Sequence, residues 1–160
     1  MKKFDLTDWV RVAMYAALYT ALTIVFAPIS YYSIQFRISN ALLAAVFLDP
    51  AAIFGVTFGL IIAGLYGGLG VFDFLVIPIL SIPMYYMVWR YCKNYWQAVL
   101  VATIFDVLVI GPIVFSLIGL SWYLGSFWLS LGDLGVFVIL GYPLYKGLRK
   151  IYKQRGISDK

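Results

Sequence analysis

Long uncharged, apolar stretches follow one another along almost the whole chain, and they limit the folds that are open to it. Hydrophobic residues make up 64% of the 160 residues and charged residues only 12%, whereas an average soluble domain carries about 25% charged residues. A helix needs about 20 mainly apolar residues to cross a bilayer. The chain is therefore predicted to be an all-α integral membrane protein, with a single transmembrane domain over residues 1–160 that makes about six spans.

The positive residues are segregated along the sequence, and this predicts the orientation. They cluster at the N-terminus, around Arg90 and Lys93, and from Lys146 onward. Short loops rich in Lys and Arg remain in the cytoplasm. Six spans place these clusters and both termini on the cytoplasmic side of the cell membrane. The Met-Lys-Lys start resembles a signal peptide, but the apolar stretch that follows is too long for one, so a retained first helix is expected.

The expected helices are bounded by prolines, glycines and polar turns. They cover Trp9–Ala27, Phe36–Leu48, Pro50–Leu65, Val71–Arg90, Trp96–Leu117 and Phe127–Tyr145, and a basic cytoplasmic tail follows from about Lys146. Asp49 is expected to cap the third helix, with Pro50 at its first position. The second and third helices are short for a hydrocarbon core of roughly 30 Å. They are expected to begin in the outer loops, to tilt, or to form a buried, partly re-entrant hairpin.

One positive residue, Arg37, falls on the opposite, outer side of the predicted bundle. Charged residues at such depth normally face the bundle interior or a water-filled cavity, where they pair or mark a site. The outer half of the bundle is expected to hold a polar group made of Gln35, Arg37, Asn40, Asp73 and Asp133. Asp106, about ten residues into the fifth helix, is expected near the midplane.

Two interpretations fit this polar group. The first is a structural ion pair, Arg37 with Asp73 or Asp133, that holds helices together. The second is an outward-open pocket for a polar, planar, mostly uncharged molecule. Carboxylates accept from amine and amide edges, Gln and Asn supply donors and acceptors, and aromatic rings offer faces for stacking. The aromatic residues expected nearby are Tyr31, Tyr32, Phe36, Trp122 and Tyr123.

Small residues recur at four-residue spacing in the first helix, at Ala13, Ala17 and Ala21. Such a stripe lets another helix approach closely. It is consistent either with packing inside the bundle or with a docking face for a partner subunit. Gly55 and Gly59 form a second small pair, which fits internal packing better.

The remaining composition argues against several functional classes. The chain has no His and a single Cys, Cys92, so it offers no intrachain disulfide and no His/Cys metal site. No nucleophile motif or Mg²⁺-binding acidic cluster typical of an enzyme is present, and no cofactor or metal is expected. The net charge of +5 lies in the predicted cytoplasmic segments, where it suits anionic lipid headgroups rather than nucleic acid.

Several segments resemble the queuosine-precursor transporter (QueT) family, the small substrate-binding S-components of energy-coupling-factor (ECF) transporters. The most specific is the run Ile-Gln-Phe-Arg-Ile-Ser at residues 34–39, inside a similar segment from Ala27 to Leu42. The resemblance continues, in the same order and at similar spacing, with Phe47–Ala51, Gly55, Gly67–Asp73 and Gly132-Asp133. The alanine stripe is similar to the motif with which S-components in general dock on their coupling subunit.

The resemblance implies a six-helix bundle of the S-component type, which is not an enzyme. Such a protein captures a queuosine precursor from outside, namely a 7-deazaguanine such as preQ0, preQ1 or queuine. ATP-driven uptake would then require a transmembrane coupling subunit and two ATPase subunits as partners. The residues implied for substrate binding are Gln35, Arg37, Asn40, Asp73, Asp133 and Tyr31, and those implied for docking are Ala13, Ala17 and Ala21.

Two positions depart from the family pattern. The family usually has Glu where this chain has Asn40, and Asp133 is one methylene shorter than the usual Glu. Asn40 keeps an acceptor, loses the charge and gains donors, so a related ligand with a different edge is possible. An S-component for another vitamin or nucleobase is therefore an alternative. A self-sufficient secondary transporter with Asp106 as proton site, and an assembly protein without a small ligand, are two others.

Overall fold

The structure, a computed structural model, describes residues 5–27, 37–67, 70–119 and 121–155, and within these ranges it contains helices and no strand. The helical elements join into six continuous rods in this part of the chain. The rods are α1 (Leu6–Val25), η1 (Ile38–Leu42) with α3 (Leu43–Leu48), α4 (Pro50–Gly64), η2 (Phe72–Val76) with α5 (Ile77–Tyr91), α6 (Tyr95–Phe105) with η3 (Asp106–Ile110) and α7 (Gly111–Ile118), and α8 (Trp122–Val136) with η4 (Phe137–Gly141) and α9 (Tyr142–Arg155).

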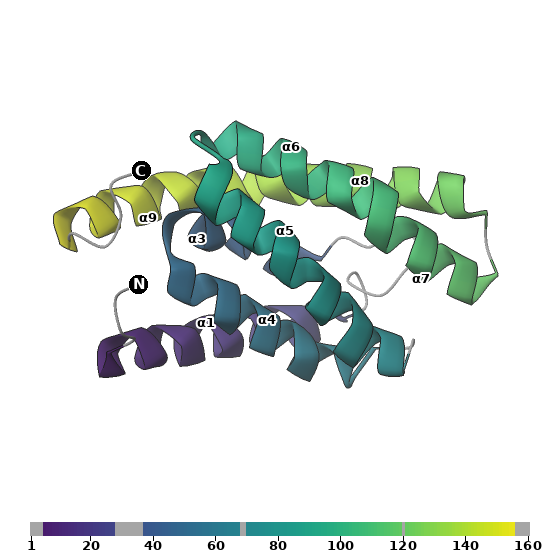
Figure 1. Cartoon of the computed structure of the whole chain (residues 1–160), viewed down its shortest axis with the longest axis horizontal. Helices are drawn as coiled ribbons and strands as arrows, with labels where there is room; N and C mark the ends of the chain where they lie inside the picture. The colour runs from purple at the N-terminus through teal and green to yellow at the C-terminus, as the bar shows by residue number, and fades with distance from the viewer. Residues whose placement is uncertain (1–4, 28–36, 68–69, 120, 156–160) are drawn as a thin grey trace.

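Successive rods reverse direction, so the start of α1 and the end of α9 lie at the same end of the bundle (Figure 1). Three rods are long and apolar enough to cross a membrane, judged by length and composition: Phe72–Tyr91, Tyr95–Ile118 and Trp122–Gln154. Two shorter apolar helices cover Ile38–Leu48 and Pro50–Gly64. An all-helical membrane architecture is thus confirmed, whereas the number of spans and the side of the termini stay predictions.

Side-chain caps decide where α1 and α4 begin. α1 begins at Leu6 rather than at Trp9, because the Asp5 carboxylate accepts from the Leu6 amide at 2.8 Å and the Asp5 amide donates back to Asp8. The predicted start of α4 is confirmed. The Asp49 carboxylate accepts from the Ala51 amide at 2.9 Å, with a proline in the first helical turn.

The last rod is longer than predicted at both ends. It begins at Trp122 instead of Phe127, and the basic tail continues the helix to Arg155 instead of leaving it at Lys146. No proline interrupts residues 122–127, and the tail is rich in Lys and Arg, which favour helix. The earlier start also moves Asp133 about three turns into the rod, deeper than the two turns expected.

Three of the rods contain a five-residue π-helical turn, and each turn lies at the same distance from a proline. One residue separates η2 from Pro78, η3 from Pro112 and η4 from Pro143. Proline has no N–H for the carbonyl four residues back, and its ring crowds that carbonyl. A π turn widens the helix by one residue at this point.

The hydrogen bonds of the π turns follow this logic. The amides of Ile77 and Gly111, each directly before a proline, donate to the carbonyls of Phe72 and Asp106, five residues back. In η4 the carbonyl of Phe137 accepts from the Tyr95 hydroxyl of α6 at 2.9 Å. The prolines therefore set local helix register, and one register change falls directly at Asp106.

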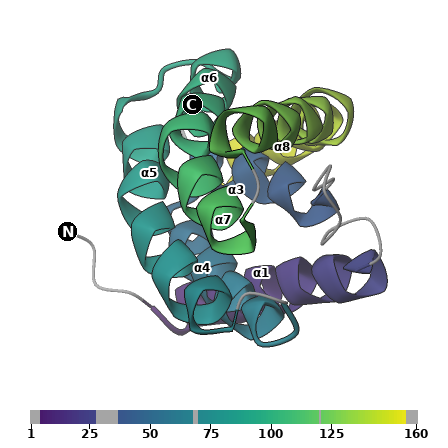
Figure 2. The same cartoon turned by 90° about the vertical axis from the view of Figure 1, so that its right-hand side faces the viewer.

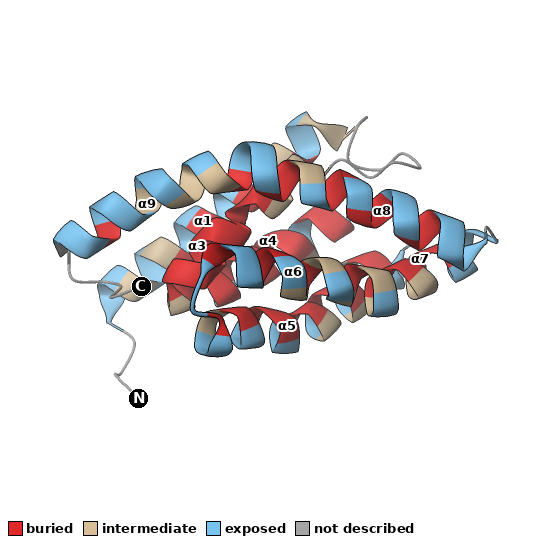
Figure 3. Cartoon of the chain, turned by 90° about the horizontal axis from the view of Figure 1, so that it is seen from above, coloured by how far each residue is buried: buried red, intermediate tan, exposed pale blue. Residues whose placement is uncertain are grey.

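The short helix α3 forms the centre of the bundle. All six of its residues are buried, and it contacts α4, α5, α6 and α9. Seen along the bundle, the longer helices surround it (Figure 2), and their buried faces turn towards it (Figure 3). A helix that is apolar on all sides belongs inside a protein. The second expected helix, observed as η1 with α3, therefore takes the buried position, which was one of the alternatives considered for it.

α1 packs closely on α4 through glycines. A Cβ on Gly55 would lie 2.5 Å from Cβ of Tyr15, and one on Gly59 would lie 2.6 Å from Cβ of Tyr19. The internal packing expected for this glycine pair is confirmed. The opposite face of α1 is exposed and carries the whole alanine stripe: Ala13, Ala17 and Ala21.

Candidate functional site

A cavity of about 50 Å³ lies inside the bundle, between α1, η1, α5, η3 and α8. Much of its wall is apolar, with Leu43, Val56, Leu60 and Met84 among the lining residues. Its polar wall consists of Tyr19, Arg37, Ser39, Asn40, Ser81, Tyr85, Asp106 and Asp133. A space of this size accommodates a few water molecules. The cavity thus combines charge, amide and phenol groups in an otherwise apolar interior.

A chain of hydrogen bonds joins three helices along one wall. The Tyr19 hydroxyl of α1 donates to Oδ1 of Asn40 at 3.1 Å, and Nδ2 of Asn40 donates to Oδ1 of Asp133 at 2.7 Å. Asn40 thus uses both ends of its amide, a role that a carboxylate could not fill because it has no donor at pH 7. Asn40, one of the two positions that depart from the family pattern, thus orients the other, Asp133.

Asp106 faces Asp133 across the cavity, within reach of a hydrogen bond when one of the two carboxyls carries a proton. From the sequence, Asp106 is expected near the midplane and outside the polar group. The structure includes it, because Asp133 lies deeper than expected and η3 turns Asp106 inward. The signal was present in the sequence, since a lone carboxylate in an apolar helix marks a functional site by default.

Arg37 reaches the cavity from the N-terminal side of η1 and forms an ion pair with Asp73 at 3.8 Å. Asp73 lies outside the cavity wall, beneath Gly67, where a Cβ would collide with its carboxylate. The predicted ion pair between Arg37 and Asp73 is confirmed. Asp73 therefore acts on the cavity through Arg37 instead of lining it.

The QueT transporter family model matches residues 9–150 of the chain. The chain belongs to the QueT transporter family. It is accordingly a membrane transporter rather than an enzyme, and the suspected family is confirmed. Comparison with curated proteins and with solved structures gave no significant match.

Buried hydroxyl groups hold the segment that carries Asn40 in this QueT family member. The Thr23 hydroxyl of α1 lies 2.7 Å from the Ser39 hydroxyl, and it also donates to the Tyr19 carbonyl at 2.9 Å. Both Thr23 and Ser39 are fully buried. A fully satisfied hydrogen-bond network of this kind fixes the register of η1 against α1.

The other residues predicted for the QueT site are distributed differently. Tyr31 and Gln35, with Tyr32 and Phe36, lie outside the described residues. Trp122 and Tyr123 are exposed at the start of α8 and do not line the cavity. Its aromatic walls come instead from Tyr19, Tyr85 and Phe137. No sequence pattern distinguishes these three residues, because aromatic residues occur along every rod.

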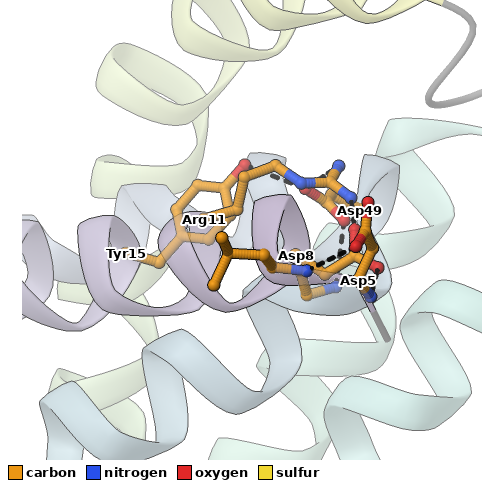
Figure 4. A network of polar contacts seen from close by, with 7 residues as sticks. Asp5, Asp8, Arg11, Tyr15 and Asp49 are labelled. Carbon is orange, nitrogen blue, oxygen red and sulfur yellow. Dashed lines mark hydrogen bonds and ion pairs between the residues drawn. The ribbon is translucent and has the colours of Figure 1, made fainter. Parts of the chain in front are cut away.

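A second polar network lies where α1 and α4 begin (Figure 4). Arg11 forms an ion pair with Asp8 and donates to Oδ2 of Asp49 at 3.0 Å, and the Tyr15 hydroxyl donates to the same oxygen at 3.2 Å. Asp49 is completely buried. Its burial raises the pKa of the carboxyl, although the Ala51 amide and Arg11 oppose the shift. This network ties α1 to the turn between α3 and α4.

Proposed function

We propose that the chain is the substrate-binding S-component of an ECF-type importer, and that it captures a 7-deazaguanine queuosine precursor from outside the cell. The observation that carries the proposal is the cavity, which brings Asp106, Asp133, Asn40 and Arg37 together in a member of the QueT transporter family. Tyr31 and Gln35 remain part of the proposed site through the family resemblance.

The chemistry of the cavity suits a guanine-like ring. Such a ring presents N–H donors on one edge and a carbonyl acceptor beside them, so a carboxylate and a guanidinium can satisfy the two together. Asp133 supplies an acceptor that Asn40 already holds in place, and Arg37 supplies donors. Tyr19, Tyr85 and Phe137 offer flat apolar faces for the ring.

The present cavity is smaller than the ligand. Small-molecule sites typically measure about 300–1,000 Å³, whereas this cavity has about 50 Å³. Binding therefore requires the walls to move apart. Arg37, directly before η1, and Asn40, within it, would have to remain with the ligand while the surrounding helices shift.

The exposed alanine stripe supports the part of the proposal that concerns binding to a coupling subunit. Ala13, Ala17 and Ala21 lie on the face of α1 opposite to α4, where nothing in the described part of the chain covers them. A transmembrane helix of the coupling subunit could approach this face closely. The two ATPase subunits would supply the energy for uptake.

The same proposal includes a multi-pass position in the cell membrane with both termini in the cytoplasm. The turn between α5 and α6 and the helix α9, both of which carry positive residues, lie toward the end of the bundle that holds the start of α1 (Figure 1). This arrangement agrees with the rule that positive loops face the cytoplasm. The basic end would contact anionic lipid headgroups.

The test is thermal unfolding of the purified chain in detergent, with and without preQ0, preQ1 and queuine. A ligand present at 100 times Kd stabilises the folded state by about 2.7 kcal/mol. We expect at least one of the three to raise the melting temperature. Asp133→Asn should remove the effect, whereas Asp5→Asn, which changes the net charge equally and still caps α1, should keep it. No shift with any of the three would contradict the proposed ligand class.

A second candidate is a self-sufficient secondary transporter. Asp106 faces Asp133 inside the cavity, and carboxyl pairs of this kind can carry a proton. Uptake by the chain alone in liposomes, driven by a pH gradient and without ATPase subunits, would favour this function. Uptake that requires the partner subunits and ATP would favour the S-component.

A further inference from the structure

An aromatic and cationic cluster joins the start of α6 to the start of α9. The Trp96 ring of α6 stacks on Tyr142 of α9, with 5.3 Å between the ring centroids. Nζ of Lys146 lies over the Tyr142 ring, 4.7 Å from its centroid. Trp96 and Lys146 are both exposed. The face of an aromatic ring attracts a cation, so Tyr142 holds the ammonium group in place and leaves N–H donors open to a ligand.

A second set of contacts repeats this pattern three residues further along α9. The Tyr95 ring stacks on Tyr145, with 4.9 Å between the centroids, and the guanidinium of Arg149 lies over Tyr145 at 5.8 Å. Tyr95 is buried, and its hydroxyl donates to the Phe137 carbonyl of η4 at 2.9 Å. The aromatic rings therefore fix α9 against α6 and hold two cations, Lys146 and Arg149, at the surface of α9.

One side of α9 is positively charged over two turns. It carries four exposed cations: Lys146, Arg149, Lys150 and Lys153. Their spacing of i, i+3, i+4 and i+7 places them on the same face of a helix. Residues 74–105 and 134–158, which include α5, α6 and α9, contain no Asp or Glu. The helices that build this surface thus supply no carboxylate of their own to balance it.

The carboxylates at the starts of α1 and α4 are occupied. Asp5 caps α1, and Asp8 and Asp49 form ion pairs with Arg11. Within the described ranges, no ion pair joins a carboxylate to a lysine of α9. Asp159 lies outside these ranges and can balance only one of the cations. Most of the positive charge on α9 is therefore available to an anionic partner.

The position of the cluster along the last rod matches the polar layer of a membrane. The rod Trp122–Gln154 has 33 residues, which makes it about 50 Å long. A hydrocarbon core of about 30 Å takes up about 20 residues. With Trp122 at one membrane surface, the core ends near Tyr142, so Tyr142 and Trp96 lie at the boundary where Tyr and Trp are enriched. Lys146 lies about 6 Å further along, within the headgroup layer.

From these observations we infer that Trp96, Lys146 and Arg149 form a binding site for one anionic phospholipid at this end of the bundle. The two cations bind its phosphodiester group, and the Trp96 ring packs along its glycerol and the first acyl carbons. The depth of the cluster and the exposed indole favour a lipid over a soluble phosphate. This inference rests on the membrane position included in the proposed function, and it is independent of the substrate.

The headgroup should carry a net negative charge. A choline headgroup brings its own cation beside Lys146 and cancels the charge of its phosphate, whereas a glycerol headgroup leaves that charge uncompensated. One cation near an anionic membrane surface contributes enough for about fivefold tighter binding. With two cations at the site, we expect phosphatidylglycerol to bind at least about tenfold more tightly than phosphatidylcholine.

The experiment is native mass spectrometry of the full-length chain in detergent, with equimolar dioleoylphosphatidylglycerol and dioleoylphosphatidylcholine. One phosphatidylglycerol molecule should be retained in preference to phosphatidylcholine. Lys146→Gln should lower this preference about fivefold. Lys153→Gln is the matched control, because it removes the same charge about 10 Å further along α9, and it should change the preference less than about twofold. Trp96→Leu should weaken the binding of both lipids.

Three results would overturn the lipid site. The first is equal binding of the two lipids by the unaltered chain, a comparison that needs no variant. The second is an equal loss of preference in Lys146→Gln and Lys153→Gln, because charge would then act diffusely along α9. The third is displacement of the lipid by inorganic phosphate at the same concentration, because the ligand would then be a soluble phosphate. None of these measurements involves the substrate, so their failure leaves the proposed ligand class standing, and the absence of any melting shift with the 7-deazaguanines leaves the lipid site standing.

Discussion

The side-chain amide of Asn40 donates to the Asp133 carboxylate at 2.7 Å and so connects η1 to α8, two elements separated by most of the chain. The same amide accepts from Tyr19 at 3.1 Å. Asn40 is therefore the residue through which α1, η1 and α8 are held in one arrangement around the cavity.

Replacing Asn40 tests this connection. Asn40→Asp keeps the shape but exchanges the donor for an acceptor, and it adds a third carboxyl beside Asp106 and Asp133. We expect a loss of at least about 2 kcal/mol in the free energy of unfolding, because a buried charged acceptor is left without its donor. Tyr19→Phe, which removes only the bond on the other side of the amide, should cost about 1 kcal/mol. Chemical denaturation in detergent measures both, and equal costs would contradict the central role of Asn40.

The buried Asp49 makes the opposite end of the bundle sensitive to Arg11. Arg11→Gln leaves the Asp49 charge buried without its cationic partner, so we expect a loss of about 3 kcal/mol in unfolding free energy. Asn is also a good helix cap. The double variant Arg11→Gln/Asp49→Asn should therefore be more stable than Arg11→Gln alone. A double variant that is less stable would show that the charge pair is not what Arg11 contributes.

The contact between Arg11 and Asp49 predicts that the stability of the folded chain depends on pH. Burial raises the pKa of Asp49 in the folded chain, so the folded state holds that proton more tightly than the unfolded state does. Its contribution to stability is therefore fully present below the unfolded pKa and is lost as the pH rises through the folded pKa. Without Arg11 the folded pKa rises further, so the stability deficit of Arg11→Gln should shrink when melts are repeated at acidic pH. A deficit that grows on acidification would contradict this account.

The π turn before Pro112 is expected to matter for binding. Pro112→Ala restores an N–H and allows an ordinary α-turn, which would rotate Asp106 relative to α7 by about one residue, or 100°. We expect ligand affinity to fall roughly tenfold or more, because a charged hydrogen bond is lost. Pro83→Ala is the matched control, since Pro83 lies within α5, is exposed and has no π turn before it. Equal effects of the two substitutions on preQ1 binding would exclude a specific role for the π turn.

A bulky residue in the alanine stripe should separate binding from transport. Ala17→Trp places a large ring on the exposed face of α1, so ligand binding by the isolated chain should be unchanged while uptake with coupling subunits is abolished. Leu100→Trp adds bulk to an exposed position of α6 and should leave uptake intact. If Ala17→Trp reduces ligand binding as strongly as uptake, the stripe serves the fold rather than a partner.

Much of the helix pattern could be predicted because its causes are local. The Asp49-Pro50 start of α4, the breaks at the glycines and the apolar rods depend on neighbours in the sequence. Local signals were also present where the predictions failed. The Asp5 capping box marks the start of α1 at Leu6, and the tail from Lys146 favours helix and continues α9 instead of forming a separate segment.

The sequence by itself determined that this chain is a helical membrane protein of the QueT family with few buried charges, because composition, segregation of Lys and Arg, and short motifs carry that information. Only the tertiary structure decided which charges meet. Asp73 pairs with Arg37 from outside the cavity, and Asp106 joins Asp133 within it. Such encounters depend on helix register to within one residue. In this chain, the π turns next to prolines and the start of α8 at Trp122 set that register. The number of charges along the sequence does not reveal it.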